Sequence, residues 1–132
     1  GRSGGPGVGP RPVVPPYDAF MKPILETLAD GRAAPFFELG KDAATRLGLP
    51  ADATAVQVDW DGMPVVEARV RKAAQDLEKA GLVARDGDRV CLTEVGRAEL
   101  PQLPSQLTVP ELTARFPAYA AYRAEFKARR GA

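Results

Sequence analysis

The stretch from Leu77 to Leu100, LEKAGLVARDGDRVCLTEVGRAEL, constrains the fold of this chain more than any other segment. It contains the end of a helix, a glycine, two short apolar runs around Asp86-Gly87, and a threonine. An Asp-Gly pair between apolar runs is a strong signal for a β-hairpin, and Thr93 is suited to cap a following helix. The segment therefore predicts a helix, a two-stranded hairpin and another helix in immediate succession.

The residues just before this segment predict the longest helix, over 65–81. Its apolar positions recur at helical spacing and share one face: Val66, Val70, Ala73 and Leu77. On a wheel of ~100° per residue the opposite face holds polar residues: Arg71, Lys72, Gln75 and Lys79. Arg69 and Asp76 lie on one flank, and Gly81 is a natural residue to end the helix.

Two shorter helices are expected nearer the N-terminus. Apolar residues recur from Phe20 to Leu28, with Pro23 as a kink or a late start, and again from Phe36 to Leu47. The intervening stretch 50–64 is predicted to be a loop, in which residues 56–60 alternate as a short extended piece.

Residues 110–132 are predicted to be helical, with Pro117 dividing them into two helices or kinking one. Tyr119, Tyr122 and Phe126 form an aromatic stripe there. We expect the stripe to dock on the core of the same domain. The alternatives are a dimer or effector-domain contact, and a nucleic-acid arm that includes the nearby arginines: Arg115, Arg123, Arg129 and Arg130.

The order of helix, helix, long helix, hairpin and helix is typical of a winged helix-turn-helix. The predicted fold class is mainly α with a small β-hairpin and a C-terminal helical extension. Residues 1–16 are rich in Gly and Pro and are expected to be a disordered arm or a tag remnant. We expect the winged helix-turn-helix over 17–100, and a linker with a helical tail over 101–132.

The composition argues against catalysis by this chain. The 132 residues include no His and one Cys, so a Ser-His or Cys-His nucleophile is excluded, and Cys91 alone cannot form a zinc site or an internal disulfide. Glu125-Phe126-Lys127 spells the end of a nuclease motif, but its helical context is wrong for that motif. We therefore expect no metal, no cofactor and no enzymatic activity.

The formal net charge is only +1, but the charge is unevenly distributed. Residues 17–62 hold four basic and eight acidic residues, whereas residues 108–132 hold five basic and two acidic residues. No apolar run approaches the ~20 residues needed to span a bilayer, and no signal peptide is visible. A cytoplasmic location is expected.

Two long segments, PPYDAFMKPILETLADG and ARVRKAAQDLEKAGLVARDGDRVCLTEVGRAEL, resemble the N-terminal domain of Mrr-type restriction endonucleases. The tail LTVPELTARFPAYAAYRAEF is similar to the segment that follows that domain in the family. The resemblance implies a winged helix that binds double-stranded DNA as the recognition module for a methylated target. It also implies a separate nuclease domain, attached as a C-terminal effector in the parent protein.

The DNA-contacting residues predicted from the helix face and the hairpin are seven: Arg69, Arg71, Lys72, Gln75, Lys79, Arg85 and Arg89. Arg69 is the candidate for base contact, with an ion pair to Asp59 or Asp61 as the alternative. Trp60 is interpreted as a cap over the core or as an apolar surface for a modified base.

Two other functions compete with this interpretation. A transcriptional-regulator domain of the same fold reads a palindrome as a homodimer, and its recognition helices then lie ~34 Å apart. A winged helix that contacts only proteins instead presents a flat or acidic potential over the long helix.

Overall fold

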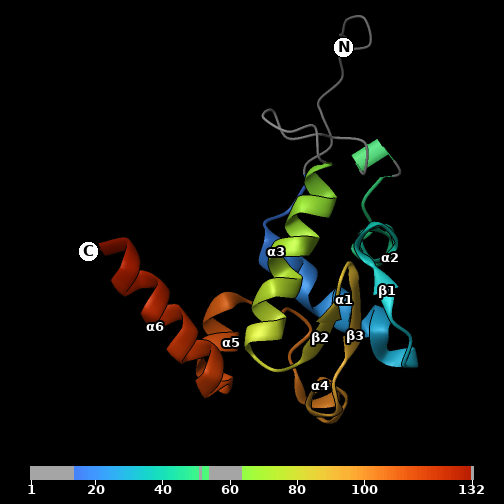
Figure 1. The fold of residues 1–132 in the computed structure, drawn as a ribbon. Helices are drawn as coiled ribbons and strands as arrows, with labels where there is room; N and C mark the ends of the chain where they lie inside the picture. Colours follow the sequence, from blue (N-terminus) through green and yellow to red (C-terminus); the bar gives the residue numbers. More distant parts are fainter. Residues whose placement is uncertain (1–13, 51, 54–63, 132) are drawn as a thin grey trace, which may run out of the picture.

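The computed structural model describes residues 14–50, 52–53 and 64–131, and Figure 1 shows their arrangement. A 3-10 helix, η1 (Tyr17–Phe20), continues into α1 (Met21–Thr27) and η2 (Leu28–Asp30). The remaining elements follow in the order β1 (Ala34–Pro35), α2 (Phe36–Arg46), α3 (Val65–Lys79), β2 (Val83–Asp86), β3 (Arg89–Leu92), α4 (Glu94–Glu99), η4 (Leu100–Gln102), α5 (Val109–Arg115) and α6 (Pro117–Gly131).

Helices α2 and α3 are each followed by a glycine with a left-handed backbone. Gly48 follows α2 with φ of 72°, and Gly81 follows α3 with φ of 85°. Pro23 lies in the first turn of α1, where a helix makes no use of its missing N–H, and the residues before Met21 form the 3-10 helix η1. The predicted helix ends are therefore confirmed.

The hairpin joins a three-stranded antiparallel sheet in the order β1-β3-β2. The predicted hairpin is confirmed, and because Asp86 pairs with Arg89 its two-residue loop is Gly87-Asp88. Gly87 has φ of 64° and stands at the first loop position, as a type II′ turn requires. Strand β1 was not predicted, because a two-residue strand leaves no alternation to detect; it forms only by pairing with β3.

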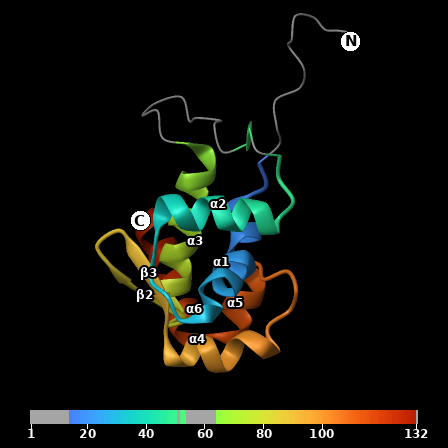
Figure 2. The same cartoon turned by 90° about the vertical axis from the view of Figure 1, so that its right-hand side faces the viewer.

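One core holds the three helices and the sheet together. Helix α2 runs across α3 and lies beside α1 in Figure 2. All four apolar residues predicted on the inner face of α3 are buried, and they meet Ile24 and Leu25 of α1 and Leu39 of α2. This burial supplies most of the favourable free energy for helices that are individually too short to be stable.

Helix α4 packs tightly under the hairpin. The Thr93 hydroxyl accepts a hydrogen bond from the Gly96 N–H at 2.9 Å and donates one to the Gly81 carbonyl at 2.7 Å. Thr93 therefore caps α4 as predicted and also joins it to the end of α3.

The C-terminal residues form two helices. Phe116 has an extended backbone between α5 and α6, as expected before Pro117. Tyr119 is wholly buried, whereas Tyr122 and Phe126 are half-buried. In the described part of the chain no helix is long and apolar enough to cross a membrane.

Candidate nucleic-acid interface

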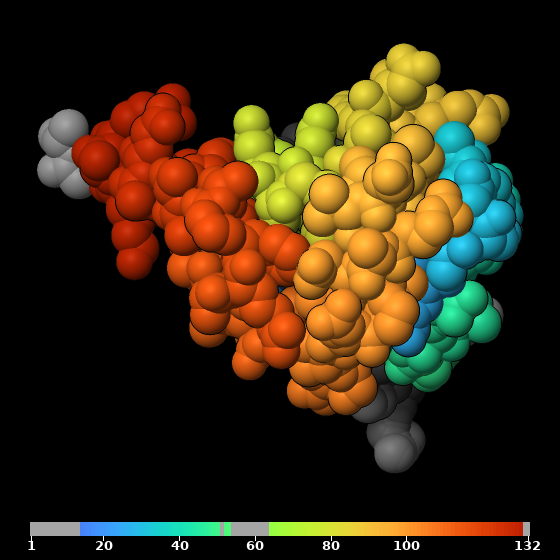
Figure 3. Space-filling view, turned by 90° about the horizontal axis from the view of Figure 1, so that it is seen from below, coloured from blue at the N-terminus to red at the C-terminus, as the bar shows by residue number. Residues whose placement is uncertain are grey.

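The outer face of α3 lies between the hairpin on one side and α6 on the other (Figures 1 and 3). Gln75, Glu78 and Lys79 are exposed on this face, and the Arg71 side chain is 37% exposed. Because neighbouring elements project on both sides, this face of α3 is recessed between them in Figure 3. The arrangement presents polar side chains of a helix to a partner that fits between two flanks.

Arg71 and Arg85 connect α3 to the hairpin through one aromatic ring. The guanidinium carbons of Arg71 and Arg85 lie 4.4 and 5.0 Å from the centroid of the buried Phe36 ring. Arg71 Nε also donates to Glu67 Oε2 at 3.0 Å, and Arg85 Nε donates to the Gly87 carbonyl at 2.8 Å. Stacking and hydrogen bonding hold both cations at the junction of α3 and the hairpin.

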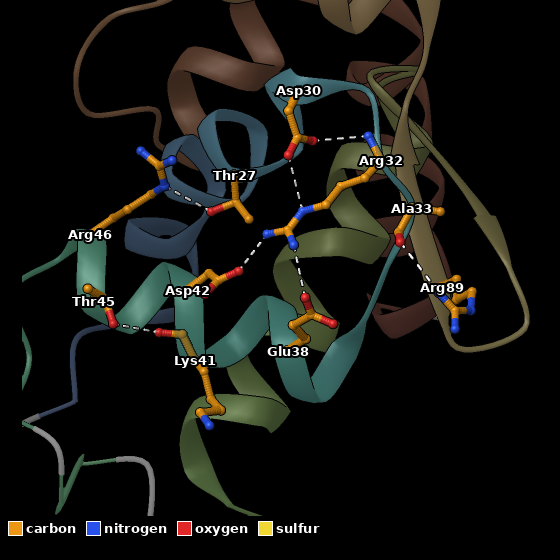
Figure 4. Close-up of polar contacts among 10 residues, drawn as sticks. All are labelled: Thr27, Asp30, Arg32, Ala33, Glu38, Lys41, Asp42, Thr45, Arg46 and Arg89. Carbon is orange, nitrogen blue, oxygen red and sulfur yellow. Dashed lines mark hydrogen bonds and ion pairs between the residues drawn. The ribbon is translucent and has the colours of Figure 1, made fainter.

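The two hairpin arginines lie on opposite faces of the sheet. Arg85 pairs with the buried Val90 and shares its face, whereas Arg89 pairs with Asp86 on the other face. Arg89 Nη1 donates to the Ala33 carbonyl at 3.5 Å, as Figure 4 shows. A ligand on α3 therefore meets Arg85 more readily than Arg89.

The Lys72 side chain is 35% exposed, about as much as that of Arg71, and it lies on the side of α3 that faces α6 and η1. Its ammonium lies 3.5 Å from Asp76 Oδ1, and 5.5 and 5.8 Å from the ring centroids of Tyr17 and Phe126. These contacts place Lys72 between α3 and the aromatic residues of η1 and α6, and its side chain stays partly exposed. Lys79 remains exposed, with its ammonium 5.3 Å from the Tyr122 ring centroid.

Arg69 is placed away from Arg71 and Gln75. Its guanidinium donates to the backbone carbonyls of Val14 and Pro15, the latter at 2.7 Å. Two residues along a helix separate side chains by ~200°, so Arg69 and Arg71 point in nearly opposite directions. Arg69 thus binds the segment before η1, whereas Asp59, Asp61 and Trp60 lie outside the described residues.

Sequence reasoning missed the burial of Asp76, which it placed on a flank. Asp76 is fully buried and accepts a hydrogen bond from the Tyr119 hydroxyl at 2.9 Å. Burial, followed by this hydrogen bond, raises the pKa of Tyr119. Burial also raises the pKa of Tyr17 to about 12, with the Asp76 carboxylate adding to the effect.

Sequence reasoning also missed an ion-pair network around Arg32, which precedes α2; Figure 4 shows it. The Arg32 guanidinium contacts Asp42 at 2.7 Å, Glu38 at 2.9 Å and Asp30 at 3.4 Å. The hydrogen bond to Asp42 raises the pKa of Arg32. Three carboxylates around one cation leave this cluster with a formal charge of −2, which disfavours binding of a polyanion at the cluster itself.

A pocket of about 190 Å³ opens between α2 and the start of α3. It is lined by Phe37, Gly40, Lys41, Pro64, Val66 and Glu67. Phe37 is 66% exposed, with the Lys41 ammonium 5.4 Å from its ring centroid. Within the described residues, no group of three or more Cys, Asp and Glu side chains is placed to hold a metal ion.

The element order, the β1-β3-β2 sheet and the exposed face of α3 beside the hairpin define a winged helix-turn-helix domain with a helical extension. The family model of the Mrr N-terminal domain matches residues 17–102, more than half of the chain. The chain therefore belongs to the Mrr N-terminal domain family. No significant match was found among curated proteins or among solved structures.

Proposed function

We propose that this domain binds double-stranded DNA through the outer face of α3 and the hairpin residue beside it. The observation that carries the proposal is the junction at Phe36, where Arg71 and Arg85 are held together next to Gln75. A helix of this kind fits the major groove, which is ~12 Å wide, and the adjacent hairpin reaches a phosphate. Membership in the Mrr N-terminal domain family supports a restriction-system role.

The residues take different roles in this proposal. Arg71, Lys79 and Arg85 contact phosphates, and Gln75 reaches base edges, because phosphate contacts position a protein and base contacts specify the site. Arg69 positions the N-terminal segment instead of reading bases, since its Nη1 donates to the carbonyls of both Val14 and Pro15. Lys72 supports the packing of α6 against α3.

Fluorescence anisotropy with a labelled duplex at several salt concentrations tests the proposal. The three phosphate contacts proposed for α3 and the hairpin contribute about −2.7 to the slope of log K against log salt, at ~0.9 per contact. Arg71→Ala should make the slope shallower by ~0.9. Arg97 is an exposed arginine of α4, and the control variant Arg97→Ala should leave the slope unchanged. Absence of duplex binding by the parent chain at ~50 mM salt contradicts the proposal.

We further propose a methylated duplex as the target and a nuclease domain elsewhere in the parent protein as the effector. This chain then acts in the cytoplasm by binding, without a cofactor and without catalysis. The pocket beside the start of α3 supports the methyl preference, because it offers the exposed Phe37 ring next to the proposed groove-binding helix. Contact of Trp60 with a modified base also stays a prediction.

A panel of methyladenine, methylcytosine and unmodified duplexes tests the methyl preference. Burying one methyl group contributes about 0.8 kcal/mol, so contact alone gives a several-fold preference. Phe37→Ala and Trp60→Ala should reduce that preference while general affinity is retained. Equal binding of all three duplexes by the parent chain contradicts it.

Protein contact is the second candidate, because acidic residues share the α3 surface with the cations. Glu67 neutralises Arg71 at 3.0 Å, and Glu78 is exposed on the same face. A domain that binds only proteins should show no duplex binding at low salt. Its binding to a protein partner should also be unchanged when the charge of Arg85 is removed.

A further inference from the structure

We propose that α6 forms a second DNA-contacting flank, in which Arg123 and Arg130 bind phosphates of the same duplex that α3 contacts. The proposal rests on DNA binding by α3, and it adds a surface outside the residues 17–102 matched by the family model. We call these two arginines and the Phe126 ring between them the α6 cluster.

The α6 cluster is held in place by aromatic packing. The guanidinium carbons of Arg123 and Arg130 lie 5.8 and 5.6 Å from the Phe126 ring centroid. Stacking occupies the face of a guanidinium and leaves its N–H edge free, and that edge matches a phosphate in a bidentate geometry. The ring therefore pre-organises two cations, which lowers the entropic cost of binding an anion.

The base of α6 is anchored firmly to α3. Tyr119 is fully buried and hydrogen-bonded to Asp76. The ring centroids of Tyr119 and Tyr122 lie 6.0 Å apart, and those of Tyr122 and Phe126 lie 6.3 Å apart. These contacts set the direction in which α6 leaves the domain and keep the α6 cluster at a defined distance from α3.

The α6 cluster is continuous with the proposed α3 interface. Lys79 is exposed on the outer face of α3 and contacts Tyr122 of α6, so its ammonium lies between the two surfaces. Both α6 and the hairpin project beside α3 in Figures 1 and 3. A duplex on α3 thus meets the hairpin on one side and α6 on the other.

The charge of α6 favours a polyanion as the occupant. In the described residues neither Arg123 nor Arg130 forms an ion pair, whereas Arg129 pairs with Glu125 and Arg115 of α5 pairs with Glu111. On α3, Asp76 is buried and engaged by Tyr119 and Lys72, whereas Glu78 is exposed. Arg123 and Arg130 therefore add two cations, without an ion pair in the described residues, beside the outer face of α3, and a DNA backbone attracts such cations.

Salt-dependent duplex binding of the double variant Arg123→Gln/Arg130→Gln tests the proposal in the full chain. Two lost phosphate contacts should make the slope of log K against log salt shallower by ~1.8 and weaken binding ~60-fold at ~100 mM salt. Phe126→Leu keeps both charges and apolar packing but removes the stacking ring, and should weaken binding to an intermediate extent.

The charge-matched control is Arg115→Gln/Arg129→Gln, which removes the same formal charge from arginines that are already paired with Glu111 and Glu125. This control should keep the parent slope. An unchanged slope in Arg123→Gln/Arg130→Gln, or an equal loss in the control, overturns the α6 proposal while DNA binding by α3 stands. A parent chain that binds no duplex overturns both proposals. Circular dichroism of each variant verifies that the helices are retained.

Discussion

At the scale of single residues, the side of an element on which an arginine lies decides what it contacts. Arg85 and Arg89 flank one turn and were equivalent candidates in the sequence. Alternation along the strands places Arg85 over Phe36 and Arg89 beside Asp86 and the Ala33 carbonyl. Only Arg85 shares an environment with Arg71 of α3.

This difference gives a prediction for DNA binding. Arg85→Ala should weaken duplex binding and make the salt slope shallower by ~0.9, because one phosphate contact is lost. Arg89→Ala removes the same charge from the other face and should change the slope by less than half as much. Anisotropy titrations at matched salt concentrations measure both variants. Equal effects would show that the hairpin acts only through its net charge.

At the scale of elements, α4 lies against the hairpin through a residue without a side chain. A Cβ at Gly96 would overlap the Leu82 carbonyl oxygen and lie 2.9 Å from Leu92 Cδ1. At Gly40 of α2 a Cβ would lie 3.6 Å from Val66 Cγ1, an ordinary contact. The packing at Gly96 therefore has no room for a side chain, whereas the packing at Gly40 has room for a methyl group.

The prediction is that Gly96→Ala destabilises the domain, whereas Gly40→Ala does not. Overpacking against backbone costs about 1–3 kcal/mol or more, and an alanine at Gly40 gains up to ~1 kcal/mol of helix propensity. Urea unfolding followed by circular dichroism measures both changes in the free energy of unfolding. A stable Gly96→Ala variant would mean that α4 can move away from the hairpin without loss.

At the scale of the whole molecule, the buried Asp76–Tyr119 hydrogen bond joins the winged helix-turn-helix to its C-terminal extension. Both groups are fully buried, and the bond links residues far apart in sequence. Tyr119→Phe leaves a buried carboxylate without one of its donors. The stability of the domain therefore depends on α6.

Tyr119→Phe should lower the free energy of unfolding by about 1–3 kcal/mol near pH 8. The parent should keep its full stability below the ordinary tyrosine pKa of 10.0 and lose stability as the pH rises above it, because both Tyr17 and Tyr119 have raised pKa values in the fold. Urea unfolding measures this effect. Between pH 8 and pH 11 the free energy of unfolding should fall less for Tyr119→Phe than for the parent. An identical pH dependence would contradict this linkage.

Local chemistry accounts for the parts of the fold that were predicted correctly. A helix ends at Gly81, a turn forms at Gly87 and α4 begins after Thr93, because each depends on backbone groups only a few residues away. The periodicity of α3 identified its buried face for the same reason. These features would be expected in any fold that contained this segment.

Tertiary packing decided which polar residues of α3 remain available to a ligand. Arg69 binds carbonyls more than 50 residues earlier in the chain, and Lys72 and Asp76 contact aromatic residues of α6 more than 40 residues later. A helical wheel gives the angle of each side chain but not the element that covers it. By itself, therefore, the sequence determined the helices, the hairpin and the inner face of α3. The packing of η1, the hairpin and α6 around that helix decided which groups each polar residue of α3 contacts.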